Sequence, residues 1–362
     1  MLYNAKNLIN EYYEVKALLL TIIAAIFVFG LLVLVHEFGH FITAKMTGMR
    51  VDEFAIGFGP KLLTTKRGET VYSIRAIPLG GFNDIAGMDP TNNEAGDRGY
   101  CNKPVLSRMF VILAGSVMNF ILPVILFFGI FFFTGMNVPS TEPVIGAVIE
   151  NKPAALAGLK DGDKIIRVND NQIATWSDFV TSIKDVQKDQ SINITYERGN
   201  EILETNVTPV YDNASKRMLL GVQSKVDNKS VSFFEAVKLS LTQTYEIIAM
   251  MIAALIDIFI SPSQADLAGP IGIAQMAGKV AESGFVPLLN FAALLSLNLG
   301  IINLLPVPAL DGGHFVTLAL EAVRGKPLSP KAIIYTQRVG VALLLLLMIF
   351  ATKNDIIRVF FS

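Results

Sequence analysis

Long runs of uncharged, apolar residues alternate with polar segments along this chain. The first run covers residues 17–35 and the second covers 109–136. A helix needs about 20 apolar residues to cross a hydrocarbon core that is about 30 Å thick. The pattern therefore predicts membrane-spanning helices over about 17–40 and 109–136.

Two later segments predict further spans, over about 285–310 and 332–352. Pro306 and Pro308 interrupt the first of these segments, which favours a broken or partly unwound helix. The second is short, and the long side chain of Arg338 within it can reach the lipid headgroups. The chain is thus predicted to cross the membrane about four times.

The polar stretch between the first two spans alternates short β-type runs with glycine. Residues 71–75 form one such run, and Gly57, Gly59 and Gly68 stand at turns between runs. Alternation of this kind predicts a small sheet or hairpin over 51–82. The alternative is a solvated loop, which the many Lys and Arg residues of the stretch would also allow.

Residues 137–212 have the pattern of a compact α+β domain. A strand-like run over 144–149 precedes a turn rich in Gly and Asp, over 158–163. A helix over 175–186 carries apolar residues at helical spacing, and a strand pair surrounds 198–200. This order resembles a circularly permuted bacterial PDZ domain, a fold that binds extended peptides as an added strand.

A linker is predicted to follow this domain, over 213–282. Its segment 232–260 is largely apolar, but Asp257 interrupts the apolar run. A charge at membrane depth is costly, so an amphipathic helix at the membrane interface is favoured over a fifth span.

The composition agrees with a chain that lies largely in lipid. Of the 362 residues, 52% are hydrophobic and only 17% are charged, and the mean hydropathy is +0.50. A net charge of −1 gives no reason to expect a nucleic-acid partner. The single cysteine, Cys101, excludes an intrachain disulfide framework and a cysteine zinc cluster. A metal ion would have to bind histidine and carboxylate side chains.

Lys and Arg residues gather in two loops beside the spans, one over 45–103 and the other over 324–338. Cytoplasmic loops of membrane proteins carry the excess of these residues. We therefore expect both loops on the cytoplasmic side of the membrane. Both termini and residues 137–282 are then expected on the opposite side.

The polar residues at the end of the first span carry the candidate chemistry. His36, Glu37 and His40 follow the apolar run directly, and the chain has three histidines in all. Positions i and i+4 of a helix share one face, so both imidazoles can reach one zinc ion, with Glu37 as general base. Ionisable groups at membrane depth usually mark function. The pattern therefore favours a zinc hydrolase over a plain helix end at the headgroups.

A catalytic zinc ion usually has three protein ligands and a water, so a third ligand must come from elsewhere. The candidates beside apolar segments are Asp257, Asp311 and His314. Asp311 is favoured because Pro306 and Pro308 precede it and can present it on unwound chain. His314 is the second choice.

Together these residues resemble the site-2 protease family (M50 type), in particular its bacterial RseP-type branch. The motif residues are His36, Glu37 and His40 on the first span and Asn303, Pro306, Pro308, Asp311 and Gly312 on a later one. The likeness extends to Gly57-Phe58-Gly59-Pro60 and 77–82 in the hairpin, and to 267–274. Ser116 is a departure, because relatives usually have proline there.

The resemblance implies a polytopic α-helical membrane protein with a membrane-associated β-hairpin on the cytoplasmic side. An α+β PDZ-like extracytoplasmic domain is inserted between the two halves of a protease core. The expected parts are 1–136 and 283–362 for the core, 137–212 for the PDZ-like domain and 213–282 for the linker. One Zn²⁺ per chain would be held by His36, His40 and Asp311, near the cytoplasmic side of a bacterial inner membrane.

The same resemblance implies an intramembrane zinc metalloendopeptidase that acts in regulated intramembrane proteolysis. Its partners would be transmembrane protein substrates, such as membrane-anchored anti-sigma factors or remnant signal peptides. The PDZ-like domain would screen substrates or bind a peptide. The residues expected to contact the unwound substrate are Gly57, Phe58, Gly59, Asn119, Asn303, Pro306 and Pro308.

Two other functions fit parts of the pattern. One is a catalytically inactive, PDZ-bearing membrane adaptor, and the intact set of His36, Glu37, His40 and Asp311 argues against it. The other is a zinc transporter. Transport needs repeated polar sites along a path, whereas this chain concentrates its polar residues in one place.

Overall fold

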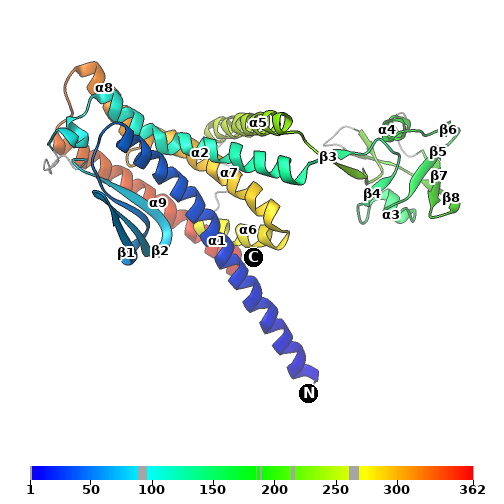
Figure 1. Ribbon diagram of the computed structural model, residues 1–362. Coiled ribbons are helices and arrows are strands. Elements are labelled where there is room, and N and C mark those ends of the chain that lie inside the picture. The colour runs from blue at the N-terminus through cyan, green and yellow to red at the C-terminus, as the bar shows by residue number, and fades with distance from the viewer. Residues whose placement is uncertain are drawn as a thin grey trace. The chain divides into compact units, whose positions relative to one another are not determined.

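The apolar sequence folds into long helices (Figure 1). In the computed structural model these helices are α1 (Leu2–Met46), α2 (Val105–Thr134), α5 (Phe233–Ile260), α7 (Phe285–Leu304) and α9 (Pro330–Phe361). The structure describes residues 2–88, 96–184, 186–187, 190–212, 217–260 and 269–361. Within these ranges, five helices are long and apolar enough to cross a membrane.

The ends of the predicted spans differ from those of the helices. The spans expected over 17–40 and 332–352 lie inside α1 and α9. The span expected over 109–136 stops at Thr134, because Gly135 has a φ of +75° and ends the helix.

The segment expected as a span over 285–310 is not helical throughout. Helix α7 ends at Leu304, and residues 305–310 form no helix. Pro306 and Pro308 lack the amide hydrogen that a continuing helix would need, which explains this end. Leu267 and Ala268, which open the segment expected to lead into this span, lie outside the described residues.

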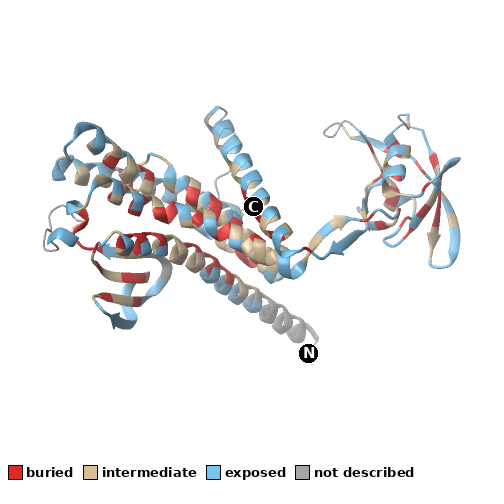
Figure 2. Ribbon diagram, turned by 45° about the horizontal axis from the view of Figure 1, so that its top comes forward, coloured by how far each residue is buried: buried red, intermediate tan, exposed pale blue. Residues whose placement is uncertain are grey.

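The segment expected as an interfacial helix, 232–260, forms α5. Its length and apolar composition also make it a fifth candidate span. The large apolar side chains of α5 and α9 are mostly exposed, as for Met250 and Leu346 (Figure 2). Such broad apolar surfaces suit a lipid environment rather than water.

The chain divides into two units, which we call the helical unit (residues 1–130 and 233–362) and the β-rich unit (residues 131–232). The helical unit also contains α6 (Pro270–Glu282), α8 (Asp311–Arg324) and two short 3-10 turns, Gly96–Arg98 and Tyr100–Asn102. A bidentate ion pair of 2.5 and 3.1 Å joins Arg108 on α2 to Glu321 on α8.

A two-stranded sheet packs beside α1 in the helical unit. Its strands are β1 (Val51–Arg67) and β2 (Thr70–Ile85), so the predicted hairpin continues three residues beyond its expected end at 82. Ala55 pairs with both Phe82 and Ser73, so the first part of β1 has strand neighbours on both sides.

Apolar side chains fix this sheet against the helices. Phe41 of α1, Phe54 of β1, Val111 of α2 and Leu318 of α8 belong to one buried cluster. Burial of such side chains removes apolar area from water and holds the four elements together. The carboxyl end of α1 therefore has a fixed position relative to β2 and α8.

The β-rich unit contains ten strands and two helices among the residues described. They are β3 (Met136–Pro139), β4 (Ile145–Val148), α3 (Pro153–Leu156), β5 (Lys164–Val168), β6 (Asn171–Gln172), α4 (Trp176–Lys184), β7 (Ile192–Arg198), β8 (Glu201–Val207), β9 (Val210–Asp212), β10 (Arg217–Leu219), β11 (Val222–Ser224) and β12 (Val226–Lys229). Strands β6, β5, β7 and β8 form one sheet in that order. The domain end expected at 212 is too early, because β11 pairs with β4 and β12 pairs with β3.

Candidate metal centre

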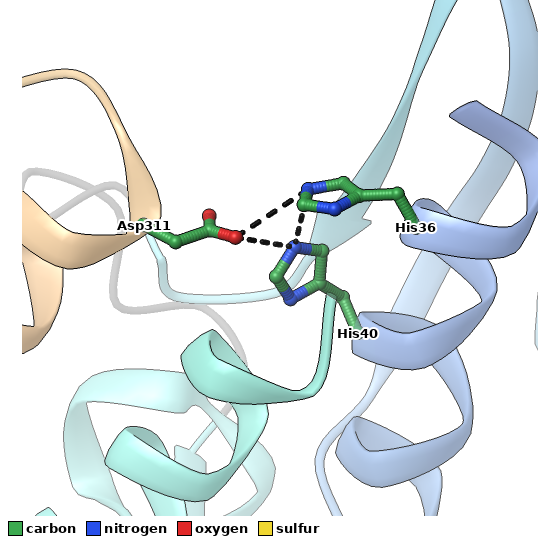
Figure 3. Close-up of side chains that lie close together, drawn as sticks. All are labelled: His36, His40 and Asp311. Atoms are coloured by element: carbon green, nitrogen blue, oxygen red, sulfur yellow. Dashed lines mark hydrogen bonds and ion pairs between the residues drawn. The ribbon is translucent and has the colours of Figure 1, made fainter. Parts of the chain in front are cut away.

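The two histidines of the motif lie one turn apart on α1 and face the same way (Figure 3). Their Nε2 atoms are 3.2 Å apart, and their rings meet edge to face at an interplanar angle of 86°. The α-helix produces this arrangement because residues i and i+4 are neighbours on its surface. Two imidazole nitrogens that could bind a metal therefore converge on one point.

Asp311 reaches the same point from α8. Its Oδ2 atom is 3.4 Å from Nε2 of His36 and 3.6 Å from Nε2 of His40. Asp311 is the first residue of α8, directly after the non-helical residues 305–310. The prediction placed it on unwound chain, whereas the structure places it at the helix start that follows.

The next residue explains how Asp311 comes so close. A Cβ atom on Gly312 would lie 2.3 Å from the carbonyl oxygens of Leu304 and Leu305. Any side chain there would push α8 away from the end of α7. The Asp311-Gly312 pair therefore combines a candidate ligand with the close backbone contact that positions it.

The residues of this cluster fit a zinc ion. Two imidazole nitrogens and one carboxylate oxygen lie within 4.8 Å of one another. This donor set leaves one tetrahedral position open, as in catalytic zinc sites. Gly115 of α2 supplies the space, because a Cβ there would lie 2.3 Å from Nε2 of His40 and 2.7 Å from Cε1 of His36.

The remaining ring nitrogens have partners that orient the imidazoles. Nδ1 of His40 lies 2.8 Å from the carbonyl oxygen of Val111. A carbonyl can only accept, so Nδ1 carries the proton and Nε2 keeps its lone pair for a metal. Nδ1 of His36 lies 3.1 Å from Nδ2 of Asn119.

The Asn119 amide is best placed with its two ends exchanged. As placed, its Oδ1 atom is buried and has no hydrogen-bond partner among the described residues. Oxygen and nitrogen of an amide are assigned from the hydrogen-bond network. The exchange lets Oδ1 accept the Nδ1 proton of His36, which leaves Nε2 of that ring free for a metal. Ser116 Oγ similarly donates to Oδ2 of Asp311 at 3.3 Å.

Glu37 lies next to the cluster and contacts the sheet. Nδ2 of Asn83, on β2, donates to the backbone oxygen of Glu37 and to its Oε2 atom, each at 2.7 Å. The sequence reasoning missed Asn83, because no spacing or motif connects position 83 to position 37. Only the close approach of β2 to α1 brings them together.

A cavity of about 310 Å³ collects these groups. It is lined by His36, Glu37, His40, Asn83, Asp311, His314 and Asn303, with apolar residues from β2, α2 and the 305–310 turn. The cavity thus offers a metal-binding set, a carboxylate and two amides in one partly enclosed space. The amides and the carboxylate can form hydrogen bonds with a peptide group, and a metal ion held by His36, His40 and Asp311 would polarise its carbonyl.

The other predicted residues take different places. The candidate metal-binding group contains Asp311, and neither His314 nor Asp257 belongs to it within the described chain. Gly57, Phe58, Gly59, Asn119, Pro306 and Pro308 do not line the cavity. Asn119 is fully buried against His36, and Phe58 stacks on Phe82 with ring centroids 6.4 Å apart.

The sequence is similar to those of several known proteins. The sequence profile described as Peptidase family M50 matches residues 24–347. The Regulator of sigma-W protease RasP of Bacillus subtilis is 33% identical over 94% of this chain and 99% of its own length. The zinc metalloprotease RasP of Geobacillus kaustophilus is 34% identical over 94% of this chain and 98% of its own length.

Solved structures match a smaller part of the chain. The PDZ domain of the SdrC-like protein of Listeria innocua is 19% identical, with a TM-score of 0.22. The match covers 25% of this chain and 98% of that domain.

Proposed function

The chain is a zinc metalloprotease of peptidase family M50, and we propose that His36, His40 and Asp311 hold its zinc ion while Glu37 is the general base. The observation that carries this proposal is the convergence of three ligand atoms within 4.8 Å, on apolar helices and beside a carboxylate. Zinc held there supplies Lewis acidity to the reaction.

The chain's own residues account for the proton transfers of peptide hydrolysis. Glu37 removes a proton from the attacking water and returns it to the amine that leaves. With its amide exchanged, Asn119 would accept the Nδ1 proton of His36 through Oδ1. The Val111 carbonyl accepts the Nδ1 proton of His40, so both rings keep their orientation. The apolar residues around the cavity limit the access of bulk water.

The substrate is a membrane-spanning segment of another protein, opened locally before it is cut. A helix pairs its amides and carbonyls internally, so the scissile bond is not accessible until the helix unwinds. Asn303 and the β1–β2 sheet would bind the opened backbone. Two observations support this assignment: Asn303 lines the cavity, and residues 82–83 of β2 border it. Gly57, Phe58, Gly59, Pro306 and Pro308 would act by shaping the sheet and the turn.

Membrane-anchored anti-sigma factors and remnant signal peptides are the proposed substrates. The name of the Bacillus subtilis relative, Regulator of sigma-W protease, supports the first of these. The β-rich unit, proposed to be the PDZ-like domain, would screen substrates before they reach the cavity.

The proposed orientation places the metal centre near the cytoplasmic side and both termini outside. The loop between α1 and α2 carries many Lys and Arg residues. Near the other end of α1, a Cβ on Gly278 of α6 would lie 2.1 Å from Thr21 Oγ1, and Asp355 of α9 accepts the Gly272 amide at 2.8 Å. The early part of α1 and the late part of α9 therefore lie at the same end of the helical unit.

Helix α5 is proposed to lie at the membrane interface. Its residue Asp257 would be costly at the centre of a bilayer.

Cleavage by the purified protein in detergent tests the assignment of Glu37. The substrate is a reporter protein with one membrane-spanning segment, and zinc content is measured on the same samples. We expect Glu37→Gln to keep its zinc and to lose cleavage, and His36→Ala to lose both. Glu282→Gln, which changes an exposed carboxylate on α6, should behave as wild type. Wild-type protein without zinc would favour the adaptor instead.

A further inference from the structure

Asn83 makes an unusual pair of contacts with a single residue. Its Nδ2 atom donates both to the backbone oxygen of Glu37 and to Oε2 of the same residue, each at 2.7 Å. One amide group of Asn83 thus hydrogen-bonds both to the carboxylate of Glu37 and to the main chain of Glu37. We propose that Asn83 is a positioning residue that holds the Glu37 carboxylate toward the metal-binding group. This inference rests on the proposed role of Glu37.

The orientation of the Asn83 amide follows from its partners. A backbone carbonyl and an ionised carboxylate can only accept hydrogen bonds. If the amide were turned over, Oδ1 would face two acceptor oxygens and repel both. Nδ2 must therefore face Glu37.

This orientation leaves Oδ1 of Asn83 buried and without a hydrogen-bond partner in the part of the chain that the structure describes. An unpaired buried acceptor is unfavourable. A residue chosen only for the stability of β2 would not need such an atom, since an apolar side chain of similar size would fill the space. Asparagine differs from such an apolar side chain in making the two hydrogen bonds to Glu37.

The close approach of β2 to α1 places Asn83 beside α1. A Cβ atom on Gly81, two residues earlier, would lie 2.7 Å from the carbonyl oxygen of Ala55 and 3.2 Å from Cγ of Glu37. The absence of a side chain at Gly81 therefore lets β2 approach both β1 and α1 closely. Asn83 and Glu37 also line the same cavity as His36, His40 and Asp311.

Holding the Glu37 carboxylate in one orientation would assist its role as general base. A general base must lie within hydrogen-bond reach of the proton that it removes. With Oε2 held by Asn83, rotation of the carboxylate is restricted and Oε1 is left for the water. Misplacement by about 1 Å can cost about 100-fold in rate.

Two variants of Asn83 separate this role from simple packing. Asn83→Leu keeps the approximate shape without a donor, and Asn83→Asp keeps the shape but puts a second carboxylate beside Glu37. We expect Asn83→Leu to lower kcat by about 10- to 100-fold, or about 1.4 to 2.7 kcal/mol at 1.36 kcal/mol per factor of ten. KM should stay within about twofold, because Asn303 and the main chain of β2, which would bind the opened substrate, are unchanged. Asn83→Asp should lower kcat at least as much.

Readouts other than activity accompany these measurements. Zinc content and thermal stability should match wild type in Asn83→Leu. The affinity for a peptide hydroxamate, a zinc-directed probe whose hydroxyl can donate to a nearby carboxylate, should fall along with kcat. Thr242→Ala, an exposed position on α5, is the control and should change none of these quantities.

Each outcome decides a separate point. Full kcat in Asn83→Leu would overturn the positioning role, and so would loss of zinc or stability, because packing alone would then explain the residue. Glu37→Gln is measured in parallel. If that variant cuts at the wild-type rate, the proposed base is wrong; if it is inactive while Asn83→Leu is fully active, only the positioning role fails.

Discussion

At the scale of single residues, the metal centre depends as much on missing side chains as on ligands. Gly115 faces both imidazoles, and Gly312 lets α8 begin against the end of α7. Neither glycine could serve as a ligand, yet each sets how closely the ligand-bearing helices meet. The space between the helices is therefore part of the site.

Gly115→Ala tests this view of the site. The new Cβ would lie 2.3 Å from Nε2 of His40, where real Cβ atoms are not found, so the imidazoles must move. We expect the variant to lose most of its zinc, as measured by metal analysis of purified protein. Gly129→Ala, on the same helix, meets nothing within 4 Å and should keep its zinc. Equal zinc in both variants would contradict the expectation.

The spacing of His36 and His40 and the prolines before Asp311 allowed the cluster to be predicted from the sequence. Both signals are local, since one is a helical period and the other a break in a helix. Asn83 and the tight fit at Gly115 could not be predicted in this way. They depend on where β2 and α2 pack against α1, which no local pattern specifies.

At the scale of elements, the β1–β2 sheet is held by a charged network as well as by its strand pairing. Glu53 of β1 accepts hydrogen bonds from Ser73, Lys61 and Arg75. Burial raises the pKa of Glu53, but these donors outweigh burial and lower the pKa to about 2. The ionised carboxylate therefore stabilises the folded sheet.

This network predicts a pH dependence. Because the folded pKa lies below the ordinary value of 4.5, the stabilisation is fully present above that value and is lost as the pH falls toward about 2. The melting temperature of wild type should exceed that of Glu53→Gln at pH 7, and the difference should shrink as the pH falls below about 4.5. Glu246→Gln, an exposed position on α5, should show no such trend. A constant difference for Glu53→Gln would rule out the network.

Helices and strands differed in how well the sequence predicted them. Long charge-free runs identified α1, α2 and α9, because lipid requires a continuous apolar segment. The end of the β-rich unit was predicted too early, because β9, β10 and β11 are three residues long each. Such short strands show no measurable alternation. Strands β9 and β10 pair with each other, and β11 is identified only by its pairing with the distant strand β4.

At the scale of the whole molecule, the β-rich unit has its own hydrophobic core. Phe179, Ile165 and Ile194 are each 0% exposed and belong to one cluster confined to that unit. A separate core allows a unit to fold independently. Residues 131–232 should therefore fold when produced alone.

Phe179→Ala in this fragment tests that independence. Removal of a buried phenylalanine side chain should lower the free energy of unfolding by about 3 to 5 kcal/mol, as measured by urea denaturation. Leu156→Ala removes a side chain that is 80% exposed. This variant should change the free energy of unfolding by less than about 0.5 kcal/mol. A fragment without a cooperative transition, or equal losses in the two variants, would refute independent folding.

The distance in sequence between His36 and Asp311 has a consequence for biosynthesis. The histidines leave the ribosome early, whereas Asp311 follows only after the β-rich unit and α7 have been made. Until then the nascent chain has two of the three residues proposed to hold zinc. The nascent enzyme would thus remain inert until α8 has been made and has packed against α1.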